Sequence, residues 1–122
     1  MTDGKPRKVA IVDDDGAVRH SLQFLLEVAG HTVEAFASAA ELLSSDVQHL
    51  ACLILDHHMP HMTGLDLVER LRARGEAIPV LLMTGAPSTV IAARAAQLGV
   101  ERVLAKPVSE NDLFEFVNAK VL

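Results

Sequence analysis

The sequence has little of what marks secreted, membrane or nucleic-acid-binding proteins. It contains one cysteine, Cys52, so no disulfide framework can form, which is typical of a reducing compartment. No apolar run approaches membrane-spanning length, and residues 1–8 are too polar for a signal peptide. No basic cluster offsets the formal net charge of −5. We therefore expect a soluble, cytoplasmic protein that binds neither membranes nor nucleic acids directly.

Internal repeats, low-complexity segments and linkers are also missing from the sequence. Half of the 122 residues are apolar, which argues against disorder and is enough to build a core without disulfide or metal staples. We therefore expect one domain that spans residues 1–122.

Two kinds of hydrophobic pattern alternate along this domain. Short apolar runs, several of them β-branched, predict strands at residues 8–12, 32–36, 51–55, 80–83 and 102–105. Helical periodicity, N-cap residues and glycine stops predict helices at residues 18–29, 38–43, 64–74, 88–98 and 109–121. The second helix is predicted to begin with a capping box, Ser38 to Glu41.

This alternation predicts an α/β fold with a parallel sheet covered by helices on both faces. Right-handed crossovers leave few topologies, and the common one at this size is the flavodoxin-like, doubly wound order 2-1-3-4-5 with five helices. Its switch point lies between strands one and three. The acidic residues Asp13, Asp14 and Asp15 would then lie beside Asp56.

Four of the five predicted strands end in a reactive polar residue. Taken one at a time, an Asp after a strand is usually a helix cap, a Thr is usually a turn residue, and a Lys before Pro usually faces solvent. The predicted sheet brings all of these residues to one edge, which is much less likely to occur by chance. The residues are Asp13, Asp14, Asp56, Thr84 and Lys106.

Phosphoryl transfer accounts for these residue types. Crowded carboxylates retain protons unless a cation intervenes, and Mg²⁺ prefers oxygen ligands and phosphate. The reaction needs positioning and neutralisation of charge on the phosphoryl oxygens, which a metal, the Lys106 ammonium and the Thr84 hydroxyl can supply. A carboxylate can act as the nucleophile and form an acyl phosphate. Asp56 is the candidate nucleophile.

Short motifs around these residues resemble the receiver domain of two-component response regulators, over essentially the whole chain. They are Val12-Asp13-Asp14, Leu55-Asp56-x-x-Met59-Pro60, Thr63-Gly64, Met83-Thr84-Gly85 and Lys106-Pro107. Within that family, the chain is similar to receivers of the nitrogen-fixation and LuxR-type regulators through Val12-Asp-Asp-Asp, Val18-Arg19 and Ser21-Leu22.

The resemblance implies a role for each matching residue. Asp56 would accept the phosphoryl group from a sensor histidine kinase or phosphotransfer protein. Mg²⁺ would be held by Asp14 directly, by Asp13 mostly through water, by Asp56, and by the backbone carbonyl of His58. Thr84 and Lys106 would contact the phosphoryl group, and the Lys106–Pro107 bond would be cis.

The resemblance also implies a signalling phosphoacceptor rather than an enzyme, one that catalyses its own phosphorylation and dephosphorylation. Its output face would be helix four, strand five and helix five, which is also a possible homodimer surface. The family often has an aromatic residue three positions before the lysine, and here that position is Val103. We therefore expect the signal to pass through residues 85–88 and helix four instead.

Two other functions compete with this interpretation. Asp13-x-Asp15-x-Ala17 resembles the nucleophile motif of haloacid-dehalogenase-type phosphatases, in which Asp13 would be the nucleophile and Asp15 the general acid. That assignment leaves Asp56 without a role. A receiver-like module that only binds a protein is the other possibility, but it predicts losses among the five site residues that the sequence does not show.

A histidine cluster follows Asp56: His57, His58 and His61. Imidazole suits Zn, Cu and Ni, so a transition-metal site is one interpretation. Their spacing matches no common ligand pattern, and the alternative is polar residues in a solvent-facing loop.

Overall fold

The sheet has five parallel strands, in the order that the sequence predicts. The computed structural model describes residues 7–121. The sheet order is β2-β1-β3-β4-β5, and every neighbouring pair is parallel. The strands are β1 (Lys8–Val12), β2 (Val33–Phe36), β3 (Leu50–Asp56), β4 (Val80–Thr84) and β5 (Arg102–Ala105).

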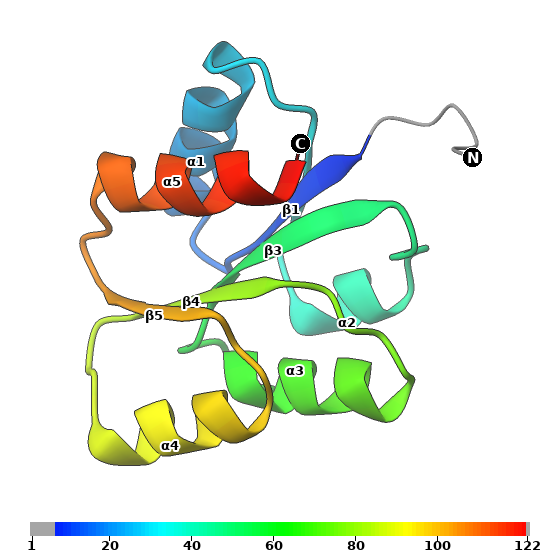
Figure 1. The fold of residues 1–122 in the computed structure, drawn as a ribbon, viewed down its shortest axis with the longest axis vertical. Coiled ribbons are helices and arrows are strands. Elements are labelled where there is room, and N and C mark those ends of the chain that lie inside the picture. Colours follow the sequence, from blue (N-terminus) through cyan, green and yellow to red (C-terminus); the bar gives the residue numbers. More distant parts are fainter. Residues whose placement is uncertain (1–6, 122) are drawn as a thin grey trace.

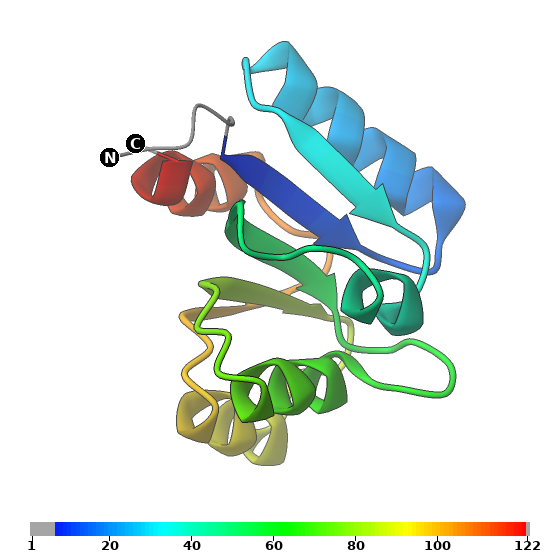
Figure 2. The same cartoon turned by 90° about the vertical axis from the view of Figure 1, so that its right-hand side faces the viewer.

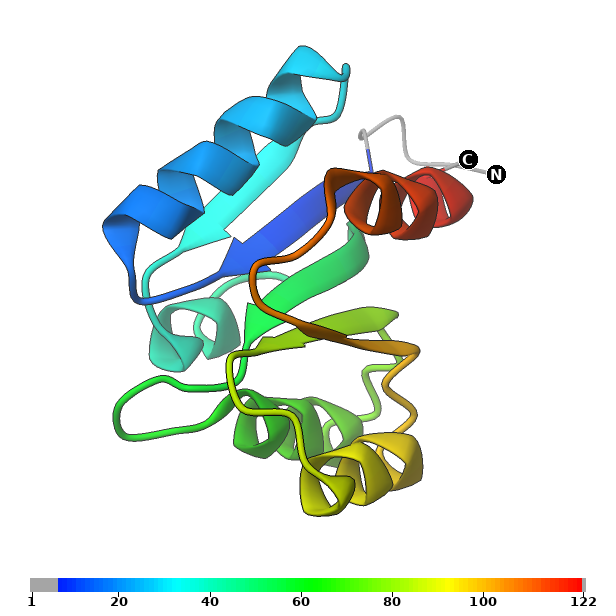
Figure 3. The ribbon, with the colours of Figure 1, turned by 90° about the vertical axis from the view of Figure 1, so that its left-hand side faces the viewer.

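Five helices cover the two faces of this sheet. They are α1 (Gly16–Val28), α2 (Ala39–Leu43), α3 (Gly64–Ala73), α4 (Thr89–Gln97) and α5 (Glu110–Val121). Figure 1 shows α1 and α5 on one face and α2, α3 and α4 on the other, and the side views in Figures 2 and 3 agree. The predicted doubly wound architecture is confirmed.

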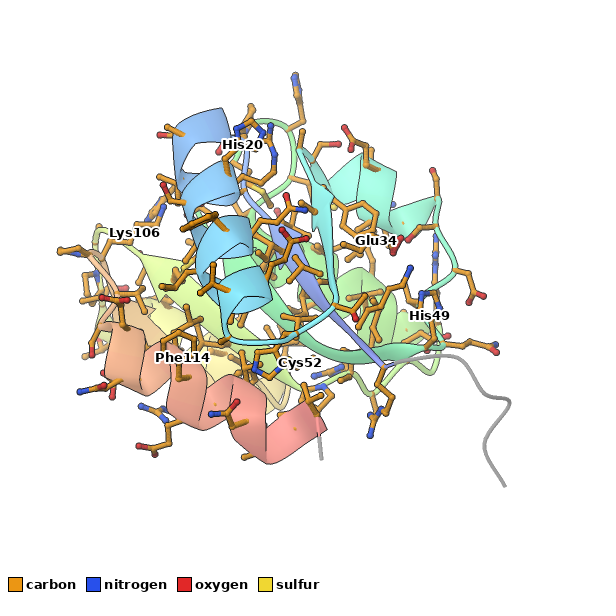
Figure 4. All side chains as sticks on the ribbon, turned by 90° about the horizontal axis from the view of Figure 1, so that it is seen from above. His20, Glu34, His49, Cys52, Lys106 and Phe114 are labelled. Atoms are coloured by element: carbon orange, nitrogen blue, oxygen red, sulfur yellow. The ribbon has the colours of Figure 1, made fainter. Side chains whose placement is uncertain are left out.

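The core is divided between these two faces because side chains alternate along each strand. In β3 all seven residues are buried, as expected for a central strand with helices on both sides. Leu53 and Leu55 pack toward α2, α3 and α4 with Leu82 of β4. Cys52 and Ile54 pack toward α1 and α5, and Figure 4 places Cys52 between those two helices.

Phe116 is the buried phenylalanine of α5, because it continues the helical spacing of Leu113 and Val117. One side-chain prediction needs correction. The capping box of α2 is only half formed. Ser38 accepts from the Glu41 N–H, but the Glu41 carboxylate accepts from the N–H of Ala37, the residue before the cap.

Strands β3 and β4 each continue one residue past the predicted end. Asp56 pairs in register with Met83, and Thr84 pairs with Ala105. The His57 N–H donates to the Met83 carbonyl and the Lys106 N–H to the Thr84 carbonyl, which extends both ladders. Asp56 and Thr84 are therefore fixed by strand geometry rather than by loops.

Candidate functional site

Three carboxylates meet beyond the carboxyl ends of β1 and β3. Asp13, Asp14 and Asp56 each offer an oxygen, and these oxygens lie within 4.8 Å of one another. Asp13 and Asp56 are almost completely buried, whereas Asp14 is exposed. The sheet order causes this meeting, because β1 and β3 are neighbours and the chain leaves them in opposite directions.

Lys106 reaches the same point from the end of β5. Its Nζ lies 2.9 Å from Asp56 Oδ1 and 3.7 Å from Asp13 Oδ2. The Lys106–Pro107 peptide bond is cis, as predicted. Burial by itself lowers the pKa of Lys106, but the hydrogen bond to Asp56 and the charges of Asp13 and Asp56 outweigh it, so the pKa is raised and the ammonium stays charged. Figure 4 shows Lys106 and His49 toward opposite ends of the molecule.

Asp13 is held by its own loop. One carboxylate oxygen accepts from the Asp15 N–H at 2.9 Å, and the Asp13 carbonyl accepts from the Arg19 guanidinium at 2.7 Å. Burial raises the pKa of the Asp13 carboxyl, the Asp15 hydrogen bond opposes this, and the nearby Asp56 charge adds to the rise. The other oxygen, Oδ2, is buried without a hydrogen-bond partner in the described chain.

This arrangement fits a hard cation. A buried carboxylate oxygen without a hydrogen bond, beside two further carboxylates, is electrostatically unfavourable until a positive charge is shared among them. Oxygen-only ligands are what Mg²⁺ prefers. Lys106 neutralises part of the negative charge but makes no hydrogen bond to Asp13 Oδ2.

Thr84 lies at the end of β4 with its side chain fully buried. Its hydroxyl oxygen accepts from the Ala86 N–H at 3.0 Å. The same oxygen is 2.8 Å from Nε2 of His58. Thr84 therefore already uses its hydroxyl to connect the loop after β4 with the loop after β3.

The histidine cluster is not a shared metal site. Among residues 7–121, the group that could hold a metal ion is the Asp13, Asp14 and Asp56 cluster, with no histidine in it. The prediction that all three histidines face solvent is wrong for His57, which is buried. Burial lowers the pKa of His57, and the neighbouring His58 and Arg94 lower it further. His61 is exposed and has a positive φ of 70°.

Close packing at Gly64 explains the path of this loop. A Cβ at position 64 would lie 2.6 Å from the Asp56 carbonyl oxygen and 2.9 Å from the His57 Cα. The Gly64 N–H also donates to the His57 carbonyl at 2.9 Å. The start of α3 is thus pressed against the end of β3, which turns the His57 side chain into the protein.

The bond between the His58 side chain and Thr84 is a site contact that the sequence did not reveal. The family resemblance implies a role only for the His58 backbone carbonyl, as a metal ligand. The pattern of residues carries no signal for the imidazole, because its direction depends on the folded path of the loop.

Comparisons with known proteins agree with this geometry. A family model described as the response regulator receiver domain matches residues 9–118. The chain belongs to the response regulator receiver domain family. It is therefore the receiver domain of a two-component system, and the phosphoacceptor role is standard for this family.

Two curated relatives cover most of this chain. The transcriptional regulatory protein FixJ of Azorhizobium caulinodans is 39% identical over 93% of the chain, which corresponds to 54% of that protein. The response regulator protein TodT of Pseudomonas putida is 38% identical over 91% of the chain and 49% of that protein. The receiver chain thus spans about half the length of these relatives.

Solved receiver structures have the same fold. The crystal structure of FixJ-N is 30% identical, covers 96% of this chain and 94% of its own, and has a TM-score of 0.85. The Vibrio cholerae chemotaxis protein CheY4 is 28% identical, covers 97% of this chain and 100% of its own, and has a TM-score of 0.84. None of the helices described for this receiver is long and apolar enough to cross a membrane.

Proposed function

We propose that Asp56 is the residue of this receiver that accepts the phosphoryl group, from a sensor histidine kinase or a phosphotransfer protein. The observation that carries the proposal is the position of its buried carboxylate. It lies 2.9 Å from the Lys106 ammonium and within reach of Asp13 and Asp14, at the carboxyl edge of the sheet. A carboxylate oxygen would attack phosphorus as the bond to the donor imidazole breaks, leaving an acyl phosphate.

Mg²⁺ is the cofactor that these residues would hold. Its ligands would be Asp13, Asp14, Asp56 and the His58 backbone carbonyl, to which no N–H of residues 7–121 donates. Bound there, the ion would neutralise charge on the phosphoryl oxygens. The chain's own contribution is to bury Asp13 and Asp56, to hold Asp13 through the Asp15 N–H, and to place Lys106 against Asp56.

The phosphorylated state would differ from the free state through two side chains. A phosphoryl group on Asp56 adds negative charge that the Lys106 ammonium and the Thr84 hydroxyl can engage. Because the Thr84 hydroxyl accepts from the Ala86 N–H, its movement would displace residues 85–88 and α4. The surface formed by α4, β5 and α5 would carry the output and is a possible homodimer interface.

The competing phosphatase assignment agrees poorly with the contacts of Asp15. Asp15 is the N-cap of α1, and its carboxylate accepts from the N–H groups of Ala17 and Val18. A carboxylate in that role stabilises the helix and is poorly placed to act as a general acid. The module that only binds a protein would not need Lys106 paired with a buried Asp56.

The test is covalent labelling with acetyl phosphate and Mg²⁺, followed by mass spectrometry. Wild-type protein should gain one phosphate, and Asp56→Asn should gain none. Asp15→Asn is the matched control, because Asn caps a helix as well as Asp does and the variant should still be labelled. Persistent labelling of the Asp56→Asn variant at Asp13 would contradict the assignment.

As a domain, residues 1–122 would act as a signalling phosphoacceptor that catalyses its own phosphorylation and dephosphorylation and has no separate substrate. We place it in the cytoplasm, and we propose that it makes no direct contact with nucleic acid, in keeping with its net charge of −5. The names of its relatives as transcriptional regulators describe proteins about twice as long.

A further inference from the structure

The His58 imidazole is hydrogen-bonded to the Thr84 hydroxyl, on which the proposed switch depends. His58 Nε2 and Thr84 Oγ1 are 2.8 Å apart, and the same Oγ1 accepts from the Ala86 N–H at 3.0 Å. A hydroxyl has one donor hydrogen and two acceptor lone pairs. Two of these three capacities are therefore in use before any phosphoryl group arrives, whichever tautomer His58 adopts.

The His58 ring also contacts the His57 ring. The two rings meet edge to face with centroids 5.0 Å apart and an interplanar angle of 77°. The buried His57 ring accepts from the Leu65 N–H at 3.4 Å, in the first turn of α3. The contacts thus form a continuous path from α3, through both imidazoles and Thr84, to the loop that precedes α4.

We propose that His58 is a positioning residue that holds the Thr84 hydroxyl in the unphosphorylated arrangement and competes with the phosphoryl group for it. The inference rests on the proposed function of Asp56 and Thr84 and adds to it a regulatory role for the His58 side chain. When the hydroxyl turns toward Asp56, its bond to His58 breaks. A population shift requires such contacts that differ between the two states.

This competition predicts the direction in which the affinity for a phosphoryl mimic changes when His58 is replaced. Removing the imidazole removes an interaction that stabilises only the unphosphorylated state, so the phosphoryl-bound state becomes easier to reach. One intramolecular hydrogen bond typically changes an equilibrium by about two- to tenfold. His58→Leu should therefore bind beryllofluoride, which mimics the phosphoryl group, about two- to tenfold more tightly than wild type.

The experiment measures beryllofluoride affinity in the presence of Mg²⁺. NMR measures the Thr84 side-chain rotamer in the absence of beryllofluoride. His58→Gln, whose amide can bond to a hydroxyl, should restore part of the wild-type affinity. His61→Asn is the matched control, because His61 is an exposed histidine of the same loop with no bond to Thr84, and Asn tolerates the positive φ of 70° at this position. His58 is exposed, so its replacement should leave the fold intact, which urea unfolding checks.

A double-mutant cycle separates competition from a merely structural role. Thr84→Val keeps the shape of Thr84 but lacks the hydroxyl, so adding His58→Leu to it should leave the affinity unchanged. An effect of His58→Leu that persists in the Thr84→Val background would overturn the proposal, and so would unchanged or weaker binding by His58→Leu alone.

Failure of the Asp56 assignment would give a different result from failure of the His58 proposal. If wild type does not bind beryllofluoride, or if Asp56→Asn binds it equally well, the Asp56 assignment is wrong. In that case the NMR measurement still decides the His58 contact. His58→Leu should spread Thr84 over more than one rotamer, and an unchanged single rotamer would overturn the positioning role.

Discussion

At the scale of single residues, Gly64 is a glycine that the site requires. The Asp56 carbonyl and the His57 Cα occupy the space where a Cβ would lie. Both atoms belong to the backbone that carries the candidate phosphoacceptor, so neither can move without disturbing Asp56. The packing at position 64 therefore couples stability to the geometry of the site.

We predict that Gly64→Ala lowers the free energy of unfolding by about 1–3 kcal/mol, the usual penalty for overpacking, and weakens labelling by acetyl phosphate. Urea unfolding measures the first effect and mass spectrometry the second. Gly16→Ala is the control, since its Cβ would meet only Arg19 Nη2 at 3.4 Å and should change stability little. A Gly64→Ala variant as stable as wild type would contradict the packing argument.

Cys52 provides an independent residue-scale test of the core. It is fully buried in β3, and burial raises the pKa of its thiol to about 12. Because the thiolate is the reactive form, the native protein should resist thiol reagents at pH 8 and should react completely in urea. Rapid, stoichiometric labelling of native protein at that pH would show that β3 opens or is exposed.

At the scale of elements, the Arg94 side chain joins α4 to α3. Arg94 of α4 lies 2.9 Å from Asp66 and 3.7 Å from Glu69 of α3. Asp66 also completes the capping box with Thr63 at the start of α3. The Arg94 hydrogen bond, followed by that of the Thr63 N–H, lowers the pKa of Asp66.

This ion pair predicts a dependence of stability on pH. A carboxyl whose pKa is depressed by folding adds stability above its unfolded pKa, and that stability is lost as the pH falls through the folded pKa. The advantage of wild type over Arg94→Gln should therefore be constant above pH 3.8 and shrink below it. Because Asp66 is 46% exposed, we expect no more than about 0.5 kcal/mol after solvent screening.

Urea unfolding at several pH values, with Arg70→Gln on the exposed side of α3 as the control, provides the measurement. The control should show no difference from wild type that disappears at low pH. A wild-type advantage over Arg94→Gln that grows as the pH falls would contradict the assignment of the pair.

The route of the switch is also an element-scale prediction. Val103 is half-buried in β5 and packs against the core, and its β-branched side chain has one dominant rotamer. Amide exchange at residues 85–98 should therefore change on addition of beryllofluoride in both wild type and Val103→Ala. If the changes vanish in Val103→Ala, or are missing from wild type, the signal takes another route.

At the scale of the whole molecule, the carboxylate cluster of Asp13, Asp14 and Asp56 connects cation binding to folding stability. Asp13 and Asp56 are buried close together, with Lys106 as the nearby cation, in a chain of net charge −5. A ligand that binds only the folded state stabilises it, by about 2.7 kcal/mol at a hundred times its Kd. Mg²⁺ is the ligand that we expect to act in this way.

We therefore predict that Mg²⁺ raises the Tm of wild-type protein and that a chelator reverses the rise. Asp14→Ala should lose most of the Tm shift, because it removes a candidate Mg²⁺ ligand. Asp14 is exposed, so its replacement should not disturb the core. His61→Asn, in the loop after β3 but outside the carboxylate cluster, should keep the shift, because Asn tolerates the positive φ at this position. A full Mg²⁺ response in Asp14→Ala would refute the ligand assignment.

The sequence by itself determined the sheet order and which strand-end residues meet at one edge of the sheet. Periodicity gives each strand and helix to within two residues, and parallel topology then forces the ends of β1, β3, β4 and β5 to one edge. Asp13, Asp56, Thr84 and Lys106 come together for that reason alone. Their pairing needs no loop conformation, since each lies at or directly after a strand end.

The tertiary structure alone decided which side chains the loops turn inward. His57 and His58 are adjacent and chemically identical, yet one is buried against the Leu65 N–H and the other bonds to Thr84. The bond between Arg94 and Asp66 likewise joins residues 28 positions apart. Such contacts depend on close packing at Gly64 and on the relative placement of helices, which are set by the summed packing of the core and leave no local pattern in the sequence.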